Sequence, residues 1–196
     1  MDFDAEKRRI RRGAGARRRE ITPEAAADAA ERICRALFSA FDFDNRRCVG
    51  LYAALPDEVP TRPLFDALMN SGVECLFPRV ADDGRLDFAR ATRWEDLRVE
   101  AFGVLAPDAS APAASFAAGD LVVVPGVAFD RRGARLGRGG GCYDRTFPPG
   151  AGPAVLLCGM AYEVQIEDSI PTTSHDRGMD AIVTEQEFRW TRGEQQ

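Results

Sequence analysis

Apolar residues along the chain gather in short continuous runs that alternate with amphipathic stretches. Five of these runs, each four or five residues long, have the length and composition of strands buried in a sheet. They span residues 48–52, 73–77, 121–124, 155–158 and 181–184. Between the first two runs, residues 62–70 have the apolar spacing of a helix, which Ser71-Gly72 ends. Strands that alternate with helices predict an α/β fold with a mostly parallel sheet.

Local signals refine this order of elements. Thr22-Pro23-Glu24 is a strong helix start, with an N-cap hydroxyl, a proline at the first helical position and an acid at the positive helix end. The helix that follows is predicted to run to about residue 40. A further strand is predicted at residues 86–90, and Pro78 and Arg79 are expected to end the strand before it. Residues 93–119 are less regular, and their second half has the composition of a surface connection.

Several polar segments follow directly after predicted strands. They are Glu58, Arg79, the glycine-rich residues 137–141 and residues 159–165. Ligands of parallel α/β sheets bind at the carboxyl ends of the strands. We therefore expect these segments to converge at one edge of the sheet.

Composition places the chain among globular proteins. Its 196 residues are 45% apolar and 29% charged, which suits one domain spanning residues 1–196. No apolar run approaches the roughly 18–20 residues that cross a bilayer, and the charged N-terminus does not resemble a signal peptide. The five cysteines are widely spaced without a C-x-x-C pair, and His175 is the single histidine, so a structural zinc site is not expected. These features predict a reducing compartment, the cytoplasm, and no membrane association.

The charge of the chain is uneven. Its net charge is −5, but residues 1–20 contain eight basic and four acidic side chains and so carry +4, which leaves −9 for the remainder. A basic arm on an acidic body is compatible with nucleic-acid binding or with a solvated helix. Residues 6–19 could form that helix, although Gly13 and Gly15 each cost it roughly 1 kcal/mol relative to alanine.

The densest chemical signal is the stretch LVVVPGVAFDRRGARLGRGGGCYDR at residues 121–145. Its four glycines at residues 137–141 allow close backbone approach, and Arg135, Arg138 and Arg145 supply donors suited to phosphate or carboxylate. The pattern does not fit G-x-x-x-x-G-K-[ST] and fits a dinucleotide fingerprint poorly. It therefore indicates an anion site, most simply for nucleotide phosphates, with a flexible loop as the alternative.

Asp144 follows this loop directly. A carboxylate beside a phosphate site is favourable when a cation lies between them, and Mg²⁺ is typically bound by one or two carboxylates plus phosphate oxygens. The alternatives for Asp144 are a helix cap or an ion pair with Arg145. Tyr143 could pack in the core or against a ligand, and His175-Asp176 is interpreted as a structural loop.

Six ordered segments together resemble one family, the 5-formyltetrahydrofolate cyclo-ligases, also called methenyltetrahydrofolate synthetases. The strongest is PGVAFDRRGARLGRGGGCYDR, which is similar to the family's P-G-x-A-F-D-x-x-G-x-R-L-G-x-G-x-G-Y-Y-D. The others are Lys7-x-x-Ile10-Arg11 with Thr22-Pro23-Glu24, DEVPT at 57–61, FPRV at 77–80, GMAYEVQ at 159–165, and the C-terminal series IP, HD and MDAIVTE within residues 170–185. The resemblance implies a three-layer α/β sandwich with a Rossmann-like central sheet, in which residues 1–20 form a helical arm.

The family's activity is then the expected one. The resemblance implies ATP- and Mg²⁺-dependent cyclisation of 5-formyltetrahydrofolate to 5,10-methenyltetrahydrofolate, ADP and phosphate, through phosphorylation of the formyl oxygen. The partners would be these small molecules rather than nucleic acid or membrane, and the chain would be a monomer.

The resemblance also assigns roles to residues of this chain. ATP would be bound by Lys7, Arg11, Arg135, Leu136, Gly137, Arg138, Gly139, Gly140, Gly141, Cys142 and Tyr143. The folate would be bound by Ala53, Glu58, Arg138, Gly139, Gly140 and Gly141. Mg²⁺ would be held by Asp144 with Asp180 as a second ligand, and Tyr143 and Arg145 would be catalytic.

The chain departs from the family pattern at a few positions. Cys142 stands where the pattern has the first aromatic residue of Y-Y-D, Ala106 stands where an acid is common, and Pro148-Pro149 shortens the helix that usually follows. These changes leave open an alternative function, that of a diverged relative that binds nucleotide or folate without catalysis.

Overall fold

The computed structural model describes residues 2–100, 103–150 and 154–191. The helices are α1 (Phe3–Arg19), α2 (Pro23–Ala40), α3 (Arg62–Asn70) and α4 (Cys142–Thr146), with short 3-10 helices η1 (Trp94–Asp96) and η3 (Glu163–Gln165). The strands of the main sheet are β1 (Cys48–Gly50), β2 (Glu74–Val80), β3 (Leu86–Arg90), β6 (Ala113–Ala114), β7 (Leu121–Val124), β10 (Leu156–Met160), β12 (Ala181–Val183) and β13 (Phe188–Trp190). Two smaller sheets contain β4 (Arg98–Val99) with β5 (Leu105–Ala106), and β8 (Ala128–Asp130), β9 (Arg135–Leu136) and β11 (Ile166–Glu167).

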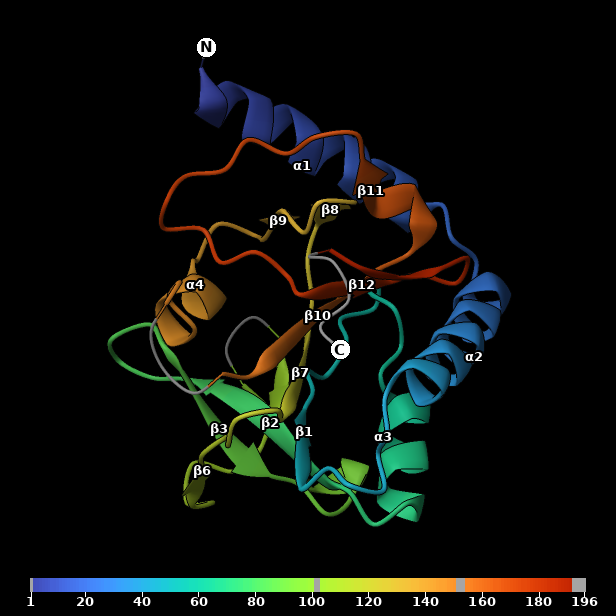
Figure 1. Cartoon of the computed structure of the whole chain (residues 1–196), viewed down its shortest axis with the longest axis vertical. Coiled ribbons are helices and arrows are strands. Elements are labelled where there is room, and N and C mark those ends of the chain that lie inside the picture. The colour runs from blue at the N-terminus through green and yellow to red at the C-terminus, as the bar shows by residue number, and fades with distance from the viewer. Residues whose placement is uncertain (1, 101–102, 151–153, 192–196) are drawn as a thin grey trace.

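A mostly parallel sheet forms the centre of the molecule (Figure 1). Within the described residues its order is β13-β12-β10-β7-β1-β2-β3-β6. The strands from β12 to β2 run parallel, and β13, β3 and β6 are antiparallel additions at the two edges. The four residues of β7 are completely buried, as expected for a strand covered on both faces.

Helices α2 and α3 cover one face of the sheet, and α4 lies on the other face (Figure 1). On the first face, Ile33 and Leu37 of α2 and Leu68 of α3 pack with Val49 and Val123 of the sheet. The second face is covered more thinly: a separate apolar cluster there includes Phe129, Phe147 and the partly buried Tyr143. The three-layer α/β prediction is therefore confirmed.

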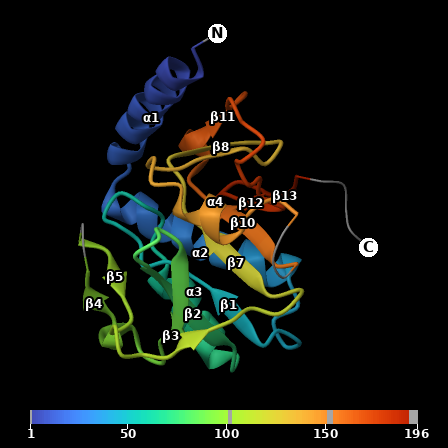
Figure 2. The ribbon, with the colours of Figure 1, turned by 90° about the vertical axis from the view of Figure 1, so that its left-hand side faces the viewer.

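Helix α1 stands apart from these layers and lies against the small β8-β9-β11 sheet (Figures 1 and 2). Only two apolar side chains of α1 are buried, Ile10 and Ala14, and they form a small cluster with Val127, Leu136 and Ile170. Asp2 caps the first turn, so the helix begins at Phe3 rather than at residue 6. The remaining contacts of α1 are polar and are described with the site below.

The prediction that Pro78 and Arg79 end the second strand is wrong. Strand β2 continues to Val80 and pairs there with β3. Its parallel pairing with β1 stops at Leu76, so from that point β2 has a neighbour on one side only. Proline lacks an N–H group and is tolerated in such a half-paired strand.

The irregular region contains more structure than the sequence indicated. Residues 93–119 include η1, β4, β5 and β6, while residues 101–102 of that range lie outside the described residues. The ends of the predicted 1–196 domain, residue 1 and residues 192–196, lie outside them too. No described helix is both long enough and apolar enough to span a bilayer.

Candidate active site

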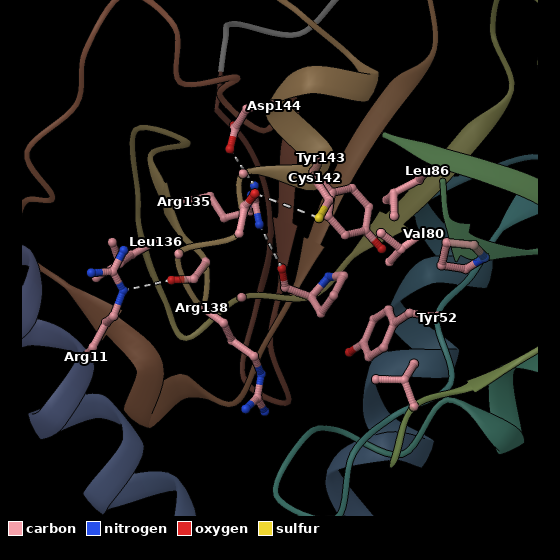
Figure 3. A pocket seen from close by; sticks show the side chains of 18 of the residues that line it. Arg11, Tyr52, Val80, Leu86, Arg135, Leu136, Arg138, Cys142, Tyr143 and Asp144 are labelled. Atoms are coloured by element: carbon pink, nitrogen blue, oxygen red, sulfur yellow. Dashed lines mark hydrogen bonds and ion pairs between the residues drawn. The ribbon is translucent and has the colours of Figure 1, made fainter. Parts of the chain in front are cut away.

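A cavity of about 490 Å³ opens where β1, β2 and β7 end (Figure 3). Its lining comes from α1, the loop at residues 51–61, the end of β2, and the glycine loop, by which we mean residues 137–141. The volume falls in the range of roughly 300–1,000 Å³ that is usual for small-molecule sites. The predicted convergence at the carboxyl ends of the strands is thus correct for Glu58 and for the glycine loop.

Two of the other segments expected at this edge lie elsewhere. Arg79 does not line the cavity; its Nη1 donates to the carbonyl oxygens of Asp108, Ala109 and Ala111. Residues 159–165 do not line it either, but the buried Gln165 supports it from behind. Its Nε2 donates to the carbonyl oxygen of Gly126, a lining residue, at 2.8 Å.

The glycine loop requires glycine at two of its positions. Gly139 has φ of 111° and Gly141 has φ of 64°, backbone conformations that side chains with a Cβ rarely adopt. Gly141 is also the N-cap of α4, so the turn directs Cys142 and Tyr143 back toward the cavity. The backbone of this segment is thus exposed to a ligand without covering side chains.

Arg135 is the most deeply buried cation of the cavity wall (Figure 3). Its side chain is 7% exposed, its Nη2 lies 3.2 Å from Oδ2 of Asp144, and its guanidinium lies 5.2 Å from the centre of the Tyr143 ring. Its Nε is buried without a hydrogen-bond partner in the described structure. A buried donor without a partner is costly, so this guanidinium is prepared to receive an acceptor from a ligand.

Tyr143 is a buried phenol. Burial raises its pKa well above the ordinary value, although the charge of Arg135 acts in the opposite direction. The hydroxyl therefore stays protonated at neutral pH. Its ring contributes a surface to the cavity and a stacking partner to Arg135.

Two cations of α1 reach the same cavity from its other side. Nε of Arg11 donates to the carbonyl oxygen of Gly137 at 2.9 Å, and Nζ of Lys7 lies 3.1 Å from Oδ2 of Asp176. Burial by itself would raise the pKa of Asp176, but hydrogen bonds from Thr173 and Lys7 and the charge of Lys7 lower it. Three cations, Lys7, Arg11 and Arg135, thus surround the backbone of the glycine loop.

The 51–61 loop forms the opposite wall. Tyr52, Ala53 and Glu58 line the cavity. The Glu58 side chain is 9% exposed; its Oε2 accepts a hydrogen bond from the backbone N–H of Leu55 at 3.0 Å, and its Oε1 lies 3.3 Å from Nη2 of Arg138. Burial and then the Glu58 charge raise the pKa of Tyr52, so its hydroxyl remains a neutral donor.

Two predicted site residues are not in the lining of this cavity. Arg145 is exposed and donates to the carbonyl oxygens of Gly84 at 3.0 Å and Gly140 at 2.6 Å, so it braces the glycine loop from outside. Oδ2 of Asp180 accepts hydrogen bonds from the backbone N–H of Leu157 and from Arg177, both at 2.9 Å. The other predicted residues line the cavity.

Comparison with known proteins identifies the family. The model of the 5-formyltetrahydrofolate cyclo-ligase family matches residues 4–185. The chain belongs to this family. The 5-formyltetrahydrofolate cyclo-ligase of Mycolicibacterium smegmatis is 30% identical over 172 residues, which cover 85% of this chain and 87% of that relative. The protein of the same name from Escherichia coli K12 is 26% identical over 171 residues, which cover 86% and 94%.

Solved structures of two similar proteins resemble the fold. The Aquifex aeolicus 5,10-methenyltetrahydrofolate synthetase matches with a TM-score of 0.80 and 29% identity, over 97% of this chain and 95% of that protein. The 5,10-methenyltetrahydrofolate synthetase of Mycoplasma pneumoniae matches with a TM-score of 0.70 over 94% and 99%, and at 19% identity this likeness concerns the fold alone.

Metal ligands in this cyclo-ligase-family chain are sparse. Among the residues that the structure describes, no three His, Cys, Asp or Glu side chains form a cluster that could hold a metal ion. The carboxylates that line the cavity are those of Asp4, Glu58, Asp144 and Asp176. Asp144 is the one that adjoins the glycine loop, and its Oδ1 accepts a hydrogen bond from the backbone N–H of Arg177 at 3.0 Å. Its single carboxylate fits a Mg²⁺ ion that takes its other oxygens from phosphate and water.

Asp176, Tyr52 and Asp4 line the cavity but were not predicted to do so. The prediction for His175-Asp176 was a structural loop, and Asp176 does accept a hydrogen bond from the backbone N–H of Thr173. The available signal was the HD pair itself, which lies in one of the six segments that resemble the family. Its approach to Lys7 across 169 positions of sequence could not be read from the spacing.

Proposed function

We propose that this chain is a 5-formyltetrahydrofolate cyclo-ligase that converts 5-formyltetrahydrofolate and ATP into 5,10-methenyltetrahydrofolate, ADP and phosphate. Membership of the family and the names of relatives that match most of the chain support the reaction. One observation in the structure carries the proposal. A single cavity joins three cations around a glycine loop to a second wall with a buried carboxylate and neutral phenols.

The chemistry requires two ligands side by side. The formyl oxygen on N5 attacks the γ-phosphorus of ATP, and the bond from that phosphorus to the bridging oxygen of ADP breaks. N10 then attacks the activated formyl carbon, phosphate departs with the former formyl oxygen, and N10 loses its proton. Neither step needs a protein nucleophile, so positioning and charge stabilisation are the main tasks of the enzyme.

The cationic wall suits the nucleotide. Arg135 has a free buried donor, and Lys7 and Arg11 have charges near the backbone of the glycine loop. Guanidinium groups and backbone N–H groups are the usual partners of phosphate oxygens. We therefore assign Lys7, Arg11 and residues 135–143 to ATP.

The 51–61 loop suits the folate. The pterin ring carries N–H donors that a carboxylate can accept, and Glu58 is a nearly buried carboxylate on the cavity wall. Ala53 leaves room beside it. Arg138 and Gly139, Gly140 and Gly141 lie between the two walls and are assigned to both substrates.

Asp144 is the proposed Mg²⁺ ligand. When bound, the ion would neutralise charge on the phosphate oxygens of ATP. Asp180 is a weaker candidate, because it does not line the cavity and its Oδ2 is committed to Leu157 and Arg177.

The two predicted catalytic residues receive supporting roles. Tyr143, as a protonated phenol stacked on Arg135, holds that guanidinium in place and presents a ring to the ligands. Arg145 fixes the carbonyl of Gly140 from outside the cavity and so determines the shape of the glycine loop. Neither contact provides a general base.

Two alternatives remain as outcomes of the test. A diverged relative that binds without catalysis is suggested by Cys142, whose thiol lies at the cavity in place of an aromatic ring. Nucleic-acid binding by α1 is less well supported, because Lys7, Arg11, Arg17 and Arg18 are engaged by groups of their own chain.

We propose a reducing compartment, the cytoplasm, for this chain because its five cysteines are free thiols in the structure. A relative from Arabidopsis thaliana is named as mitochondrial, so other members of the family work elsewhere. A monomer remains our expectation for the assembly.

The direct test follows the absorbance of methenyltetrahydrofolate with purified protein. The signal should grow only when protein, ATP, Mg²⁺ and 5-formyltetrahydrofolate are all present. Binding of both substrates to folded protein without product would favour the non-catalytic relative, and no binding would reject both.

Asp144→Asn tests the site within the same assay. It should lower kcat by about 10²-fold or more, the effect typical of removing a group that stabilises transition-state charge. The control is Asp66→Asn on α3, which removes an exposed carboxylate 3.8 Å from Arg62 and should leave turnover unchanged. Full activity of Asp144→Asn would remove the metal-ligand assignment.

A further inference from the structure

Asp57, in the 51–61 loop, lies between two arginines from distant parts of the chain. Its Oδ2 accepts hydrogen bonds from Nε of Arg18, at 3.1 Å, and from Nη2 of the same guanidinium. Its Oδ1 lies 3.4 Å from Nη2 of Arg138, and that same Nη2 lies 3.3 Å from Oε1 of Glu58. One guanidinium is therefore shared between the carboxylates of Asp57 and Glu58.

Arg18 is a fixed support for Asp57. Its side chain is 3% exposed, and its Nη1 donates to the carbonyl oxygen of Gly126 at 3.3 Å. Burial by itself would raise the pKa of Asp57, but the hydrogen bond and charge of Arg18, followed by the charge of Arg138, lower it. Asp57 is thus an ionised carboxylate with one oxygen held by a buried cation and the other directed at Arg138.

Arg138 by contrast is free to move. Its side chain is 56% exposed, and it belongs to the glycine loop. Of its two carboxylate contacts, the one with Glu58 occupies an oxygen of the acid assigned to the folate. If Arg138 paired with Glu58 alone, it would neutralise that acid and compete with the pterin for it.

We propose that Asp57 is a positioning residue that, held by Arg18, draws Arg138 away from Glu58 and so keeps the folate-binding carboxylate available. This inference rests on the proposed function, in which Glu58 receives the folate. It assigns Asp57 no contact with a reacting atom. The effect should fall on folate binding more than on ATP binding, because the contacts of Lys7, Arg11 and Arg135 do not include Asp57.

The test begins with Asp57→Asn, which keeps the shape of the side chain and removes its charge. The expected result is a rise of about ten-fold in KM for 5-formyltetrahydrofolate, as for the loss of one charge-assisted hydrogen bond, with a smaller change in KM for ATP. Asp57→Glu should recover part of the loss. Asp28→Asn, which removes an exposed carboxylate from an ion pair within α2, is the matched control and should change neither KM.

A double-mutant cycle separates positioning from a general loss of stability. Asp57→Asn also leaves Arg18 without its carboxylate, so Tm should fall whether or not Arg138 is present. The effect on folate should behave differently. In an Arg138→Ala background, where no guanidinium can close onto Glu58, Asp57→Asn should leave KM for folate unchanged.

The outcomes are separable. An equal rise in folate KM in both backgrounds would overturn the positioning role and leave the proposed function intact. An active wild type with unchanged folate KM in Asp57→Asn would overturn it as well. If the wild type binds folate without turnover, the cyclo-ligase function fails, and the same cycle run on the folate Kd by calorimetry still decides the role of Asp57. A wild type that does not bind folate overturns both.

Discussion

Helices α1 and α2 follow each other in the chain and have similar lengths, 17 and 18 residues, yet they are held in different ways. Helix α2 buries a stripe of apolar side chains against the sheet, and its ion pairs, such as Arg32 with Asp28 at 2.8 Å, stay within the helix. Helix α1 buries few apolar side chains. Its cations reach across the chain to Asp176, Gly137 and Asp57.

This difference separates stability from function. Burial of an apolar stripe is worth about 25 cal/mol per Å² and does not depend on the precise chemistry at the site. Ion pairs between partly exposed groups add little stability, with a median near 0–1 kcal/mol. The long-range cations of α1 are therefore better explained by the cavity that they line than by the fold. Mutations in the two helices should affect different measurements.

The largest effect is expected from Leu37→Ala in α2. Leu37 is completely buried, and truncation of such a side chain typically costs about 2–5 kcal/mol of unfolding free energy. Denaturant unfolding should show this loss, while both KM values of the folded fraction stay at the wild-type level. Leu37→Met, which keeps the volume, should lose less than about 1.5 kcal/mol. A changed KM for ATP in Leu37→Ala would contradict the separation.

Arg11→Ala in α1 should give the opposite result. Arg11 lines the cavity and holds the carbonyl of Gly137. Loss of its charge and hydrogen bond should weaken ATP binding by about ten- to hundred-fold, as for a hydrogen bond to a charged group. The unfolding free energy should change little, because half-exposed ion contacts contribute little.

Arg9→Ala is the matched control for this variant. It removes the same charge from the same helix, but Arg9 pairs with Glu6 on the exposed side and does not line the cavity. ATP affinity should stay near the wild-type value. Equal losses in the two variants would mean that α1 attracts ATP through its overall charge and not through the position of Arg11.

The same contrast explains what could be predicted from the sequence. The bounds of α3, β3 and β7 were predicted correctly, and α2 was predicted over its full length, because caps, turns and apolar runs are local signals. The continuation of β2 through Pro78 was missed, since it depends on where pairing with β1 stops. That is a property of the folded sheet and not of the proline's neighbours in sequence.

The site was predictable where residues adjoin in the chain. The glycine loop, Arg135 and Asp144 fall within ten positions and line one cavity. Asp144 was considered as a partner of Arg145, but it pairs with Arg135, because α4 turns the Asp144 side chain back across the loop. Contacts between Lys7 and Asp176 or Arg18 and Asp57 join distant segments, and no periodicity in the sequence predicts them.

The smallest expected effect sharpens the comparison from the side of α1. Gly15 lies in the helix, and a Cβ there would meet only the flexible end of Arg19 at 3.5 Å, an ordinary contact. Gly15→Ala should therefore stabilise α1 by up to about 1 kcal/mol through helix propensity. Hydrogen exchange should slow in the amides of α1 and stay unchanged in those of α2. Ala27→Gly, at an exposed position of α2, should have the reverse effect by a similar amount. If Gly15→Ala also left KM for ATP unchanged, α1 would already be ordered before ATP binds, held by its contacts with Asp176, Gly137 and Asp57. A lower KM for ATP would instead mean that ATP binding must first order this helix, and that its long-range cations form their full contacts only with the nucleotide in place.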